Sequence, residues 1–186
     1  MIVALALGVA CGGAGGGVGS IDWEAFVAAE EGRAWSWRGL EDDGEDTGGA
    51  LTLDAAIRGR GTGGGAIELR TGDPWVDATP LGELVWDTSA GITLARWSVG
   101  DAGGDAPRTF AEGNTTLGDV VASGGQSCTL DIPTETVETR YGGFDDVVVF
   151  DCSGDDALAG VWTFARNHGL VRVDASALAW ELIAPM

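Results

Sequence analysis

The chain has 186 residues, of which 45% are hydrophobic, and its 29 acidic residues against 10 basic ones, all arginine, give a formal net charge of −19. The apolar content and eight tryptophans suffice for one hydrophobic core, which excludes a disordered chain. The negative field repels phosphate groups, so it argues against nucleic-acid binding and against electrostatic adsorption to anionic membranes.

The chain begins with an uncharged apolar segment, residues 1–10, that ends directly before Cys11. An apolar region closed by a small residue, here Ala10, is typical of a secretory signal peptide, although the first basic residue is Arg33. A helix of this length spans about 15 Å, half the hydrocarbon of a bilayer, so the segment is too short to cross a membrane. We expect a signal peptide; a buried N-terminal strand is the alternative.

A glycine run follows the signal segment. Residues 12–19 are glycine apart from one alanine and one valine. Such a stretch is a flexible coil with a reach of about 15–18 Å. We therefore expect residues 11–20 to be a tether and residues 21–186 to form a single domain.

The domain divides into short apolar or alternating stretches separated by Gly and Asp clusters, a pattern typical of strands and turns. A helix is expected at 22–33, with Ser20 or Asp22 as its cap, and a loop that docks its tryptophan is the alternative. Strands are expected at 34–40, 50–58, 66–70, 82–87, 92–99, 115–122, 127–139, 144–152, 160–165, 169–174 and 177–183. This order predicts a mostly β fold, an antiparallel meander forming a sandwich or half-open barrel with at most one short N-terminal helix.

Aromatic residues alternate along several of these strands, which places them on one face of each. We interpret them as core residues, because tryptophan is large and usually buried. The alternative is a cavity whose ligand-facing aromatics are Trp35, Trp37, Trp162 and Trp180.

Besides Cys11, the chain has two cysteines, Cys128 and Cys152. In an exported protein such a pair predicts a disulfide. A zinc site is the weaker alternative, because these two thiols and the single histidine, His168, do not supply four ligands at zinc-finger spacing.

No catalytic residue and no cofactor is predicted. The chain lacks a nucleophile elbow and lysine, and its glycine clusters lack the context of a dinucleotide fold. The acidic residues Asp42, Asp43 and Asp46 are expected in a solvated loop, with a weak calcium site as the alternative. A pair of facing carboxylates for hydrolysis is the least favoured alternative.

Two segments resemble known proteins. Leu7-Gly8-Val9-Ala10-Cys11 resembles the lipobox of bacterial lipoproteins, with Gly8 where leucine is usual, and implies lipid attachment at Cys11. Residues 136–149 and 162–172 are similar to the end of uncharacterised bacterial lipoproteins and secreted all-β envelope proteins. These likenesses concern packing and turns, so they imply location and fold rather than activity.

The signal segment, the glycine tether, the cysteine pair and the strand pattern together lead us to expect an exported, non-enzymatic lipoprotein of the bacterial cell envelope. The resemblance to lipoproteins implies the outer membrane, because Gly12 and not aspartate follows Cys11. Export without lipid is the alternative. The expected role is binding or structural, with an unidentified protein or apolar small molecule as partner. Two further alternatives are a carrier of an apolar ligand in a Trp-lined cavity and a carboxylate-dependent hydrolase.

Overall fold

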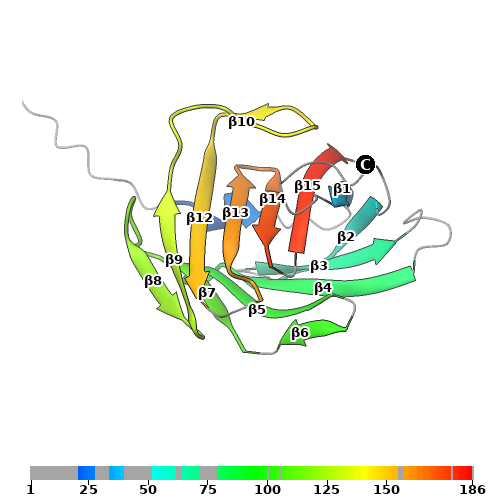
Figure 1. The fold of residues 1–186 in the computed structure, drawn as a ribbon, viewed down its shortest axis with the longest axis horizontal. Coiled ribbons are helices and arrows are strands. Elements are labelled where there is room, and N and C mark those ends of the chain that lie inside the picture. Colours follow the sequence, from blue (N-terminus) through cyan, green and yellow to red (C-terminus); the bar gives the residue numbers. More distant parts are fainter. Residues whose placement is uncertain are drawn as a thin grey trace, which may run out of the picture.

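The computed structural model describes residues 21–27, 34–39, 52–61, 64–71, 79–99, 101–104, 106–154, 157–176 and 178–185 (Figure 1). Within them lie one helix, α1 (Trp23–Val27), and strands β1 (Ala34–Gly39), β2 (Thr52–Gly61), β3 (Gly64–Thr71), β4 (Thr79–Asp87), β5 (Gly91–Val99), β6 (Ala102–Gly104), β7 (Arg108–Glu112), β8 (Val120–Ser123), β9 (Gln126–Asp131), β10 (Val137–Glu138), β11 (Gly143–Phe144), β12 (Val147–Gly154), β13 (Gly160–Ala165), β14 (Gly169–Ala175) and β15 (Leu178–Pro185).

The strands form one large antiparallel sheet made of two meanders. Its order is β6-β5-β4-β3-β2-β1-β15-β14-β13-β12-β9-β8, with β7 also paired to β5, while β10 and β11 form a separate hairpin. The first and last strands of the domain pair in the middle of the sheet, so the two halves of the chain join there. The expected mostly β, antiparallel fold with one short helix is confirmed.

The sheet curls until its two ends approach each other. Strand β7 lies beside β8 and β9, although no ladder joins β7 to β8 in the described part of the chain. In Figure 1, β12 to β15 run steeply up the view, whereas β3 and β4 run nearly horizontally. This arrangement is a sandwich closed at one side, that is, a half-open barrel, and its inner faces meet in one core.

Aromatic rings from both meanders fill that core. Trp86 of β4 lies 6.1 Å from Trp162 and 5.3 Å from Phe164, both on β13, measured between ring centroids. Phe110 of β7 lies 5.2 Å from Trp162 and 5.6 Å from Phe150 of β12. All these pairs are T-shaped, a favoured geometry worth about 0.5–1.5 kcal/mol beyond the area buried. These contacts join the two halves.

The helix α1 lies between the halves and contacts β3 and β5 on one side and β13 and β14 on the other. The Asp22 carboxylate accepts a hydrogen bond from the Ala25 amide at 3.3 Å, so Asp22 caps the helix, one of the two caps expected. Trp23, Phe26 and Val27 are buried. The rest of the expected helix, residues 28–33, lies outside the described residues.

Several strand boundaries differ from those predicted. The prediction at 115–122 was wrong over its first half, because the Asp119 carboxylate accepts hydrogen bonds from the amide and hydroxyl of Thr116 and closes a turn. The single strand at 127–139 is two strands, since Pro133 lacks an amide for the ladder. The strand at 144–152 begins at Val147 instead, and β6 and β7 were missed.

Candidate functional site

Cys128 and Cys152 form the predicted disulfide. They stand directly opposite each other in the β9–β12 ladder, with their Cα atoms 4.0 Å apart. Both are buried, and the side-chain amide of Gln126 donates to the Cys128 sulfur at 3.2 Å. The disulfide therefore lies in the hydrophobic core and links two neighbouring strands of the second meander.

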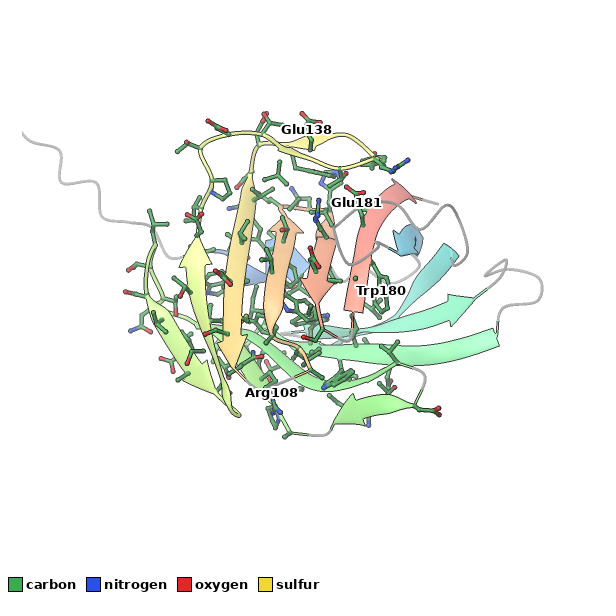
Figure 2. All side chains as sticks on the ribbon, in the orientation of Figure 1. Arg108, Glu138, Trp180 and Glu181 are labelled. Atoms are coloured by element: carbon green, nitrogen blue, oxygen red, sulfur yellow. A yellow bond between two sulfur atoms is a disulfide. The ribbon has the colours of Figure 1, made fainter. Side chains whose placement is uncertain are left out.

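The tryptophans expected to face a ligand are enclosed where their side chains are described. Trp162 is fully buried, and its indole N–H donates to the Leu158 carbonyl at 2.9 Å. Trp180 on β15 is 7% exposed (Figure 2). The side chains of Trp35 and Trp37 lie outside the described part. Protein atoms thus cover the rings of Trp162 and Trp180.

Two other indole groups lie in the interior. The Nε1 atoms of Trp23 and Trp86 are buried and find no acceptor among the residues that the structure describes, and both side chains are at least 95% buried. An unmade hydrogen bond of a buried donor costs about 1–3 kcal/mol. These donors are the interior atoms that an acceptor group would stabilise.

A second group of aromatic side chains lies at the surface, and we name Tyr141, Phe144 and His168 the tip cluster. Tyr141 stacks on Phe144 at 5.9 Å and lies 6.4 Å from His168, while Phe144 meets the His168 ring edge-on at 5.1 Å. Phe144 is buried, whereas Tyr141 is 41% exposed. The cluster joins the β10–β11 hairpin, on which Figure 2 labels Glu138, to the turn between β13 and β14.

The β10–β11 turn holds Tyr141 in place. The backbone amides and carbonyls of Thr139 and Gly142 exchange hydrogen bonds of 3.0 and 3.1 Å, which leaves Arg140 and Tyr141 as the two corner residues. The Thr139 hydroxyl also accepts from the Tyr141 amide at 3.2 Å. Since both the ring contacts and the turn fix it, Tyr141 presents a rigid aromatic face to solvent.

His168 lies in the turn between β13 and β14. Its Nδ1 atom is 2.9 Å from the Arg166 carbonyl, which only accepts, so Nδ1 carries a proton. The Arg166 guanidinium pairs with Asp146 and lies 4.6 Å from the Phe26 ring. His168 therefore supports the turn through Nδ1. The nearby Arg166 guanidinium is held by the Asp146 carboxylate and the Phe26 ring.

Among the described residues, two carboxyl groups have displaced pKa values, and both displacements are downward. Hydrogen bonds from the Ser89 hydroxyl and amide lower the pKa of Asp87, and those from the Thr116 amide and hydroxyl lower the pKa of Asp119. Both groups are exposed and close turns. A general acid in a hydrolase needs a raised pKa, so neither carboxyl is suited to that role.

The remaining predicted sites fall outside the described residues: the lipid-attachment residue Cys11 and the calcium alternative Asp42, Asp43 and Asp46. Among the described residues, no three His, Cys, Asp or Glu side chains are grouped to hold a metal ion. No helix in the same part is both long enough and apolar enough to span a bilayer.

Comparison with protein-family models, with curated proteins and with solved structures gives no match. The likeness to bacterial lipoproteins therefore rests on the residues of this chain alone. Sequence reasoning missed that Tyr141, Phe144 and His168 come together. No local signal was available, because β12 and β13 separate the turns of Tyr141 and His168 along the chain.

Proposed function

We propose that this protein is an exported lipoprotein of the cell envelope that acts by binding a partner protein rather than by catalysis. The observation that carries the proposal is the buried disulfide between Cys128 and Cys152. Disulfides form and persist in oxidising compartments outside the cytosol, where signal peptides direct a chain. The signal-like residues 1–10 and the disulfide thus point to the same compartment.

The N-terminal sequence supports attachment to a membrane through lipid. Cys11 follows Ala10 in a lipobox-like segment, and the glycine run after it supplies a flexible tether. A chain of formal charge −19 is repelled by anionic lipid, so an acyl anchor supplies the attraction that its surface lacks. Gly12 after the cysteine favours the outer membrane.

The tip cluster supports a binding role. Tyrosine and arginine are the residue types most enriched in the energetic centres of protein interfaces. Here an exposed, rigidly held Tyr141 stands next to Arg140 at the corner of a hairpin. Three exposed acidic residues belong to the same segment: Glu138 pairs with Gly143 in the hairpin, and Asp145 and Asp146 directly follow Phe144. We therefore propose the tip cluster as the contact surface for a partner that has an apolar pocket with a basic border.

Intact-mass measurement of protein from the membrane fraction, alkylated without reduction, tests the proposal. We expect a chain that lacks residues 1–10, carries acyl chains on Cys11 and leaves Cys128 and Cys152 unalkylated. Reduction before alkylation is the control and should label both. A full-length, unacylated chain with two reactive thiols would contradict the proposal.

A carrier of an apolar ligand is the second candidate. It is favoured by the indole N–H groups of Trp23 and Trp86, which find no acceptor within the described part of the chain and which an acceptor on a bound molecule would satisfy. Native mass spectrometry of the purified protein tests it, since a carrier should retain a co-purified lipid. A ligand-free mass, with no change of tryptophan fluorescence when fatty acid is added, would exclude it.

A further inference from the structure

The chain has two asparagines, and only one is followed two places later by a hydroxyl residue. Asn114-Thr115-Thr116 fits the acceptor pattern for N-glycosylation, whereas Asn167 is followed by His168 and Gly169. The pattern itself is short, so its position in the fold decides whether Asn114 can act as a glycan acceptor.

Residues 112–116 form a turn between β7 and β8 that is exposed apart from the buried Thr115. The Thr115 amide donates to the Glu112 carbonyl at 3.0 Å, and the Glu112 amide donates to the Thr115 hydroxyl at 2.8 Å. Asn114 stands at the corner of this turn and is exposed. Its carboxamide makes no hydrogen bond with any other residue that the structure describes, so the nitrogen is accessible and uncommitted.

We propose that Asn114 is an N-glycosylation site. Its carboxamide nitrogen attacks the anomeric carbon of a glycan carried on a polyprenyl diphosphate, and the bond between that carbon and the phosphate oxygen breaks. The nitrogen loses one proton, and the polyprenyl diphosphate leaves with the electron pair. The inference rests on the proposed export, because the chain meets a lipid-linked glycan only after translocation.

Thr116 is the second element of the acceptor. Its side chain is exposed, and its hydroxyl donates to the Asp119 carboxylate at 2.8 Å. That contact is at the surface and closes a turn of four residues, so local opening releases the hydroxyl without disturbing the core. A serine at this position keeps the hydroxyl, and an alanine removes it.

Glycopeptide mapping of protein from the cells that make it, together with its intact mass, tests the inference. We expect a glycan mass on the peptide that contains Asn114, retained in Thr116→Ser and in the control Asn167→Asp. It should be lost completely in Asn114→Gln and Thr116→Ala. An exported chain, cleaved before Cys11 but unmodified at Asn114, would overturn the site alone. A chain that keeps residues 1–10 would overturn the proposed export, and the site with it.

Discussion

The interior and the tip cluster use the same kind of side chain in different ways. In the interior, Trp86, Phe110 and Trp162 come from both meanders and are at least 98% buried, so their contacts hold the halves together. In the tip cluster, Phe144 is buried under a hairpin of two short strands while Tyr141 is half exposed. The difference teaches that aromatic content alone does not identify a ligand site, because enclosure decides whether a ring has a free face.

The largest effect is expected from removing an interior ring. Trp162→Ala should lower the free energy of unfolding by about 3–5 kcal/mol, because a fully buried ring and its hydrogen bond to Leu158 are lost. Urea denaturation measures it. The neighbouring Val161 is 39% exposed, so Val161→Ala is the control and should stay within about 0.5 kcal/mol of the wild type. Equal effects of the two variants would contradict the packed interior.

The second-largest loss of unfolding free energy is expected from removing the disulfide. It joins residues 24 apart, and the chain-entropy model gives about 3.5 kcal/mol for such a loop. The double variant Cys128→Ala/Cys152→Ala should lose about that amount in urea denaturation. Reducing the wild type should produce a similar loss, and a reduced wild type as stable as the oxidised one would show that the bond does not contribute.

A smaller and local effect is expected at the base of the tip cluster. Phe144→Ala should cost about 2 kcal/mol, since one buried ring is lost from a hairpin that lies outside the main sheet. Hydrogen exchange should speed up mainly in residues 137–144. If exchange instead rises evenly across β12 to β14, the hairpin is part of the main cooperative unit and the contrast drawn above is wrong.

The smallest effect concerns two turns and their pH dependence. A carboxyl group whose pKa is lowered by folding stabilises the protein above its unfolded pKa, about 4, and this contribution is lost as pH falls through the lowered value. Asp87 and Asp119 should therefore titrate below the usual range in NMR. Ser89→Ala should raise the pKa of Asp87 part of the way back, because it removes the hydroxyl bond and keeps the amide bond, and an unchanged titration would contradict the assigned cause.

The fold class was predictable because period-two alternation and glycine punctuation depend only on local sequence. The disulfide was predictable from two cysteines in a chain with a signal-like start. The strands β6 and β7 were missed since they lie in and beside a Gly- and Asp-rich stretch, although Phe110 on β7 is central to the core. Pro133 has no amide to donate to a ladder, so it was a readable sign that the strand ends before it, and the prediction passed over this sign.

The tip cluster was not predictable in the same way. Its rings come from two turns that are separated along the chain, and their contact depends on how β12 and β13 bring these turns together. The enclosure of Trp162 was equally out of reach, since it depends on Trp86 and Phe110 from the other meander. Alternation predicts which rings share a face, whereas tertiary packing decides what covers that face.

Under the proposed function, the tip cluster binds a partner while the interior rings only stabilise the fold. The most direct test is how much of the protein is retained by washed cell-envelope material. Full-length Cys11→Ser removes the lipid, and in that background Tyr141→Ala should reduce retention at least about tenfold, equivalent to about 1.4 kcal/mol, with unchanged urea stability. Leu117→Ala is the matched control, because Leu117 is an exposed apolar residue, 61% accessible, in the turn before β8, and should retain full binding. Equal retention of both variants would contradict the account.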